Sequence, residues 1–199
     1  MDLFTTLPLF SAFFVLTLGV FVFLKNHRSR ANLMFLFFCL LVGGWMFGTF
    51  MLFSNRENAT LAIFWDRFVY LWVVFIPAIM LNFALVTTSS KKISARLMVY
   101  LGYVLSIFFL FLVFNDNFVN DVFVYKWGVH TRAKLWHHIF LVYFSVYLTI
   151  FFIWVAKYYR ETEKLINKLQ ARYIFAAFLI LAIFGSLGYL PAYGISIFP

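Results

Sequence analysis

Six long apolar stretches, separated by short polar segments, dominate the chain. They run near Leu7–Leu24, Leu33–Phe53, Ile63–Val86, Leu97–Phe114, Leu135–Ala156 and Tyr173–Tyr193. A helix needs about 20 mostly apolar residues to cross a bilayer, and each stretch has roughly that length. None shows the sustained alternation that is typical of a strand in an outer-membrane barrel. The pattern predicts an all-α membrane protein with six transmembrane helices, and the short connections make neighbouring helices antiparallel.

Composition supports the same class. Hydrophobic residues make up 65% of the chain and charged residues 12%, and the mean hydropathy is +0.94. Soluble domains have about 25% charged residues. Because 199 residues cannot hide this much apolar surface in one core, lipid is the expected solvent. The sequence has no repeat, low-complexity tract or Pro/Gly linker, so we expect residues 1–199 to form a single membrane domain.

Basic residues are distributed unevenly among the connections. The first, third and fifth connections contain Lys25, Arg28, Arg30, Lys91, Lys92, Arg96, Lys157, Arg160, Lys164, Lys168 and Arg172, whereas the second and fourth contain Arg56, Arg67, Lys126, Arg132 and Lys134. Since cytoplasmic loops carry an excess of Lys and Arg, the first set is predicted to be cytoplasmic and the amino terminus outside. The net charge of +9 then reflects topology and contact with anionic membrane lipids. No basic-aromatic pattern indicates a nucleic-acid partner.

Two connections and the carboxyl end carry further signals. The fourth connection is rich in β-prone residues from Val122 to Trp127, which predicts a short β-like hairpin on the outer face. The fifth connection lacks Gly and Pro, so the fifth helix is expected to continue into the cytoplasm, with Leu165 and Leu169 on one stripe. The final GISIFP resembles the start of another apolar segment. We therefore expect the chain to be incomplete, with a seventh helix that returns to the cytoplasm.

The third stretch holds the most polar residues at membrane depth. Asp66 and Arg67 lie near its outer end, and charged groups at such depth are costly unless they face the bundle or water. One interpretation places both at the interface with lipid head groups, and the other makes them the polar rim of an outward-facing pocket floored by Tyr70. Pro77 is expected to kink the helix, either as a packing feature or as a hinge. Asn82 is expected to hydrogen-bond a neighbouring helix.

The second stretch contains a small-residue motif around a tryptophan. Gly44 and Gly48 are four residues apart, which places them on one helix face and permits close helix contact. Trp45 lies at mid-membrane and is expected to face the bundle, where its indole N–H finds a partner. The histidines lack the spacing of a helical metal site, and there is no P-loop or G-x-S-x-G motif. The sequence thus predicts no metal, no cofactor and no catalytic residue.

Several motifs follow one another along the chain in a fixed order. They are NHRSRANLMFLFF before the second helix, the Trp45 position, FWDRFVYLWVVFIPAIMLNFAL in the third helix, KWG in the fourth connection, LQARY opening the sixth helix and the final GISIFP. In this order they resemble the seven-transmembrane amino-terminal sensor region of bacterial histidine kinases.

The resemblance implies a sensory input module of a two-component system. Such a module lies in the bacterial inner membrane, acts as a homodimer and connects through its seventh helix to a cytoplasmic output domain. The 199 residues contain no phospho-acceptor helix and no ATP-binding boxes. Autokinase activity is therefore expected only of a longer protein.

We also offer a hypothesis for where a signal binds. A small hydrophobic or extracellular ligand would bind among the outer ends of the third, fifth and sixth helices, lined by Asp66, Tyr70, His137 and Tyr189, with Trp45 beneath. Two other classes stay open: a small transporter or channel, although no repeated halves and no buried acid are apparent in the sequence to support it, and a membrane assembly subunit without a ligand.

Overall fold

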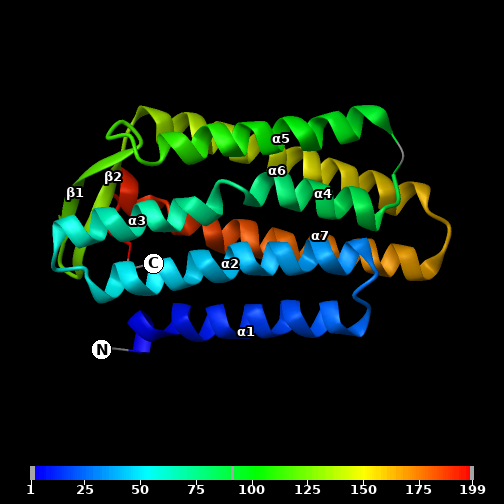
Figure 1. Ribbon diagram of the computed structural model, residues 1–199, viewed down its shortest axis with the longest axis horizontal. Coiled ribbons are helices and arrows are strands. Elements are labelled where there is room, and N and C mark those ends of the chain that lie inside the picture. The colour runs from blue at the N-terminus through cyan, green and yellow to red at the C-terminus, as the bar shows by residue number, and fades with distance from the viewer. Residues whose placement is uncertain (1–2, 91, 198–199) are drawn as a thin grey trace.

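The computed structural model describes residues 3–90 and 92–197, which form a bundle of long helices lying side by side (Figure 1). The elements are α1 (Leu3–Lys25), α2 (Arg30–Ser54), α3 (Ala59–Val73), α4 (Ile76–Thr87), α5 (Ile93–Leu112), β1 (Val119–Tyr125), β2 (Gly128–Ala133), α6 (Leu135–Glu161), α7 (Leu165–Leu187) and the 3-10 helix η1 (Leu190–Tyr193). Six spans within the described residues are long and apolar enough to cross a membrane, with α3 and α4 forming one of them. The prediction of six membrane-spanning helices is confirmed.

The predicted bounds of the last two helices were less accurate. Helix α6 ends at Glu161 and α7 already begins at Leu165, so Leu165 and Leu169 belong to α7 and do not extend α6. The backbone is extended at Thr162 and Lys164, which reverses the chain. Since α6 and α7 pack together, antiparallel packing overrides the helix propensity of a segment without Gly or Pro. At its other end α7 stops at Leu187, because Pro191 follows in η1.

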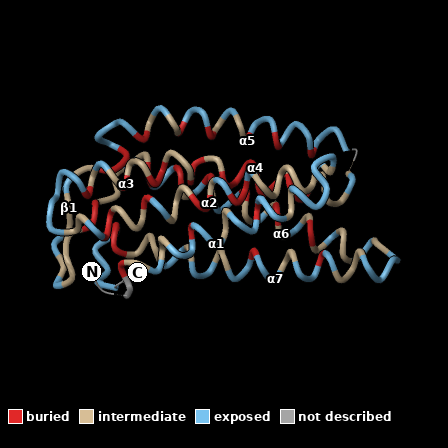
Figure 2. The backbone as a smooth tube through the Cα atoms, turned by 60° about the horizontal axis from the view of Figure 1, so that its bottom comes forward, coloured by how far each residue is buried: buried red, intermediate tan, exposed pale blue. Residues whose placement is uncertain are grey.

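Helix α4 occupies the centre of the bundle. It packs against α2, α5 and α6, whereas α1 packs along α2 and α7 packs along α6. The most apolar window of the α3–α4 span is 72% buried, compared with 6–28% in the other five spans. Buried residues accordingly gather along α3 and α4, while α1, α5 and α7 expose long faces (Figure 2). These exposed apolar faces are the surfaces that lipid would cover.

The third span is broken between α3 and α4. Pro77 lies in the first turn of α4. The N–H groups of a first turn have no acceptor within the helix, so the N–H that proline lacks costs no helical hydrogen bond. The break frees carbonyls at the end of α3, and Ser106 of α5 donates a hydrogen bond of 2.8 Å to the Val74 carbonyl. Tyr143 of α6 lies 3.1 Å from the same hydroxyl and donates to the Gly102 carbonyl at 3.0 Å. The kink thus has its own polar partners inside the bundle.

Small and polar residues fix α2 and α5 against the central span. A Cβ at Gly44 would lie 2.2 Å from the Trp72 ring, and one at Gly48 would lie 2.8 Å from Val69, so only glycine permits this approach. Asn82 of α4 donates to the Tyr103 hydroxyl of α5 at 2.9 Å and lies 3.3 Å from the Met34 sulfur of α2. Asn82 therefore joins three helices.

A two-stranded hairpin covers one end of the bundle (Figure 1). Strands β1 and β2 pair antiparallel, with a register shift between Val119 and Val122 at which Asp121 adopts a positive φ of 66°. The hairpin packs on α3 and on η1, and Tyr125 donates a hydrogen bond of 2.6 Å to the Pro191 carbonyl. We call this the hairpin end, and the opposite end, which holds the α1–α2, α4–α5 and α6–α7 connections, the basic end. Which end faces the cytoplasm stays a prediction.

Candidate ligand cavity

A cavity of about 610 Å³ lies at the hairpin end between α1, α2, α3 and α7. Four residues proposed from the sequence line it, namely Trp45, Asp66, Tyr70 and Tyr189. The other described lining residues are Leu7, Pro8, Ser11, Met46, Thr49, Leu52, Phe53, Val69, His130, Leu181, Phe184, Gly185, Leu187, Gly188 and Ile197. Most of the wall is apolar, and the ionisable groups come from α3, from the hairpin and from Tyr189 between α7 and η1.

Strand β2 positions the carboxylate of the cavity. Asp66 is only 4% exposed, and Thr131 Oγ1 donates a hydrogen bond to its Oδ2. The neighbouring His130 lines the cavity and places its Nδ1 3.2 Å from the Thr131 carbonyl. Among residues 3–90 and 92–197, no ion pair joins Asp66 to a basic side chain. A buried carboxylate held by a single hydroxyl is an electrostatically demanding group, because burial removes the water that would solvate it.

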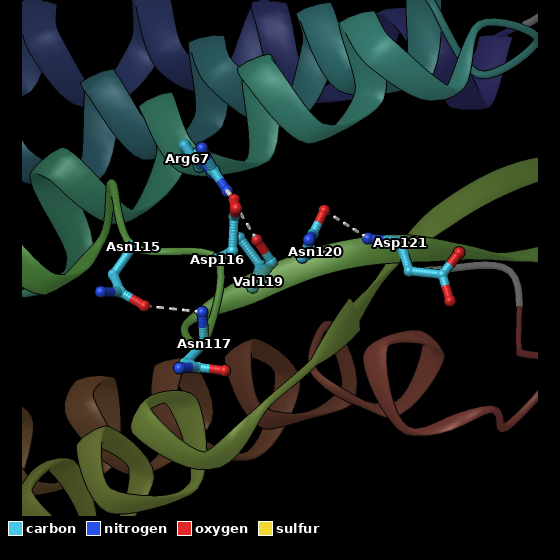
Figure 3. Close-up of polar contacts among 7 residues, drawn as sticks. All are labelled: Arg67, Asn115, Asp116, Asn117, Val119, Asn120 and Asp121. Atoms are coloured by element: carbon cyan, nitrogen blue, oxygen red, sulfur yellow. Dashed lines mark hydrogen bonds and ion pairs between the residues drawn. The ribbon is translucent and has the colours of Figure 1, made fainter.

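Arg67 points away from the cavity. Its Nη2 lies 2.7 Å from Asp116 Oδ1 and donates to the Val119 carbonyl at 3.0 Å (Figure 3). Asp66 lines the cavity, whereas Arg67 is not among the lining residues and uses its guanidinium group on Asp116 and Val119. The interpretation that both form a pocket rim is therefore wrong for Arg67, which anchors α3 to the loop before β1. That loop is ordered locally by Asn115, whose Oδ1 accepts from the Asn117 N–H at 2.8 Å (Figure 3).

His137 lies behind the cavity wall. It is fully buried, and its Nε2 lies 2.6 Å from the Tyr70 hydroxyl. Its Nδ1 lies 3.1 Å from the Tyr193 hydroxyl of η1, and that hydroxyl lies 2.8 Å from Nδ1 of the exposed His138. If Tyr70 donates to Nε2, then His137 Nδ1–H donates to Tyr193 and Tyr193 donates to His138. The other His137 tautomer reverses the whole chain.

The hairpin's contribution to this site has little signal in the sequence. Thr131 donates to the α3 carboxylate, His130 lines the same cavity, and Tyr193 contacts both histidines of α6. Alternation along β2 suggests which side chains share a face but not that this face covers Asp66. Residues of α1 such as Ser11 line the cavity only because α1 packs on α2. Within the described residues, no group of three or more His, Cys, Asp or Glu side chains could hold a metal ion.

Comparison with known proteins gives one match. The family described as the N-terminal 7TM region of histidine kinase matches residues 7–199, which is nearly the whole chain. No significant match was found among curated proteins or among solved structures. The family match covers all six membrane-spanning segments and the cavity between them.

Proposed function

Since the chain belongs to the family of N-terminal 7TM regions of histidine kinases, we propose that it passes a ligand- or membrane-derived signal to a cytoplasmic output domain outside these residues. As a member of that family it is a multi-pass membrane protein and a non-catalytic sensory input domain. The proposal places it in a bacterial inner membrane with its amino terminus outside, as a homodimer whose full-length form is a sensor histidine kinase. The uneven distribution of Lys and Arg supports that orientation.

The cavity at the hairpin end is the proposed signal site. Its volume of about 610 Å³ is within the range of small-molecule sites, and its wall is apolar with a few polar groups at one side. Trp45, Tyr70 and Tyr189 supply aromatic surface for a hydrophobic ligand, and Asp66 supplies a fixed acceptor that orients it. This combination of a mostly apolar wall and one buried carboxylate is the observation that carries the proposal.

The hydrogen-bond chain behind the cavity offers a route for the signal. Tyr70 lines the cavity and contacts His137, which in turn contacts Tyr193 in η1 near the described carboxyl end. A ligand that accepts the Tyr70 proton would favour the reversed chain, in which His137 Nε2–H donates to Tyr70. A ligand shifts such an equilibrium only by its difference in affinity for the two arrangements. The contact with Tyr193 would carry that difference toward the output domain.

The test uses the full-length protein in membrane vesicles and measures basal autophosphorylation from radiolabelled ATP. Tyr70→Phe and His137→Gln interrupt the same chain, so we expect each to change the rate at least about threefold and in the same direction. Asp66→Ala should also change it, because the cavity loses its oriented acceptor.

The matched control is Asp121→Asn. Asp121 is an exposed carboxylate on the hairpin that does not line the cavity, and asparagine tolerates its positive φ. This variant should leave the rate unchanged. Unchanged signalling in both Asp66→Ala and His137→Ala would show that the cavity is not the signal site.

A further inference from the structure

A second hollow lies at the basic end of the bundle, far from the ligand cavity. It has a volume of about 450 Å³ and is lined by residues of α2, α4, α5 and the α4–α5 connection. Its polar wall contains Arg30, Arg96, Ser89, Ser90, Asn82 and Tyr103. The described wall includes two arginines and no acidic residue, so its charge is strongly positive.

The positive charge has no partner within the described part of the chain. Neither Arg30 nor Arg96 forms an ion pair there, and both side chains are exposed. Arg30 is the first residue of α2, and Arg96 lies in the first turn of α5. Neither first turn contains an acidic residue. The positive ends of two helix dipoles therefore add to the two guanidinium groups.

The hollow continues into an apolar surface. Leu85, Val86 and Val99 complete its wall, and Tyr100 at its edge is 67% exposed. Farther along α5, Leu101 and Val104 are exposed as well, in a span that is long and apolar enough to cross a membrane. An occupant that satisfies both regions needs a negative head and a long apolar chain.

We propose that this hollow is a specific site for an anionic phospholipid, whose phosphate is bound by Arg30 and Arg96. The planar guanidinium group binds phosphate oxygens in pairs, and the hydroxyls of Ser89 and Ser90 can donate to the remaining oxygens. One acyl chain lies along Val99 and Tyr100 toward Val104. A zwitterionic lipid binds less well, because its quaternary amine would lie beside two arginines that have no acidic neighbour in the described wall.

The test titrates the purified 199-residue chain with phosphatidylglycerol or phosphatidylcholine of identical acyl chains and counts bound lipids by native mass spectrometry. We expect phosphatidylglycerol to bind at least about tenfold more tightly. The double variant Arg30→Gln/Arg96→Gln should lose about tenfold in affinity for phosphatidylglycerol and little for phosphatidylcholine. Circular dichroism with heating checks that the variant stays folded.

The matched control is Arg28→Gln/Arg160→Gln, which removes the same charge from exposed positions of the basic end that do not line the hollow. It should change the affinity for phosphatidylglycerol less than threefold. Equal losses in the two double variants, or equal binding of the two lipids to the unmodified chain, would show only diffuse attraction and overturn the site. Displacement of the lipid by millimolar glycerol phosphate would overturn the lipid assignment in favour of a soluble phosphate. If the lipid stays bound in the presence of glycerol phosphate, the result supports the lipid site.

Discussion

At the residue scale, the most consequential contact is between Asp66 of α3 and Thr131 of β2, since among the residues that the structure describes it is the one hydrogen bond to the buried carboxylate. A buried polar group that loses its partner costs more than one whose partner is replaced along with it. The contact therefore links the position of the hairpin to the chemistry of the cavity. It also explains how a charged residue is tolerated at this depth in α3.

This asymmetry predicts the outcome of a double-mutant cycle. Thr131→Val keeps the shape but removes the hydroxyl, so the free energy of unfolding should fall by about 1–3 kcal/mol. Asp66→Leu combined with Thr131→Val should be more stable than Thr131→Val alone, because no polar atom is left unpaired. Chemical denaturation in mixed micelles measures both values. If the losses in the free energy of unfolding simply add, the two side chains are not coupled.

The sequence revealed the polar residues at this scale better than it revealed their partners. Asp66, Tyr70, Trp45 and Tyr189 were identified because polar or aromatic groups at membrane depth are conspicuous in an apolar stretch. The orientation of Arg67 toward Asp116 depends on the path of a loop 49 residues away along the chain, which no local pattern encodes. His137 is expected among the lining residues, but it lies behind the wall and contacts the lining residue Tyr70.

At the element scale, glycine determines how α2 meets the central span. The pattern of apolar stretches predicted the helices, since each must satisfy its backbone internally in lipid. The same pattern missed the reversal between α6 and α7, because that reversal depends on the packing of the two helices rather than on turn residues. The predicted kink appears as a break after Val73, near Pro77.

Gly44 provides the corresponding prediction for helix packing. Alanine has the higher helix propensity, by about 1 kcal/mol, so Gly44→Ala would stabilise an isolated helix. In the bundle its Cβ would lie 2.2 Å from the Trp72 ring, and overpacking costs about 1–3 kcal/mol. We expect a net loss of stability in thermal unfolding of the purified protein. Ser145→Ala, at an exposed position of α6, should be nearly neutral. A more stable Gly44→Ala variant would mean that α2 and α3 separate readily.

At the scale of the whole molecule, the two ends of the bundle differ in both structure and charge. The hairpin end holds β1, β2 and η1 over the cavity, whereas the basic end holds the three connections with most of the Lys and Arg (Figure 1). A ligand that arrives from outside reaches Asp66 only if the hairpin end faces outward. The proposal of an extracellular ligand therefore depends on this orientation, whereas the lipid site does not.

Labelling from one side of the membrane tests that orientation. In a Cys39→Ala background, Lys126→Cys places a thiol at an exposed position of the hairpin end and Arg160→Cys places one at an exposed position of the basic end. The positive-inside bias predicts that a membrane-impermeant maleimide labels Lys126→Cys in intact cells and labels Arg160→Cys only after the inner membrane is permeabilised. The reverse result would turn the cavity toward the cytoplasm, and its ligand would then be an intracellular molecule. It would also place the Arg30–Arg96 hollow in the outer leaflet, where lipid binding would persist.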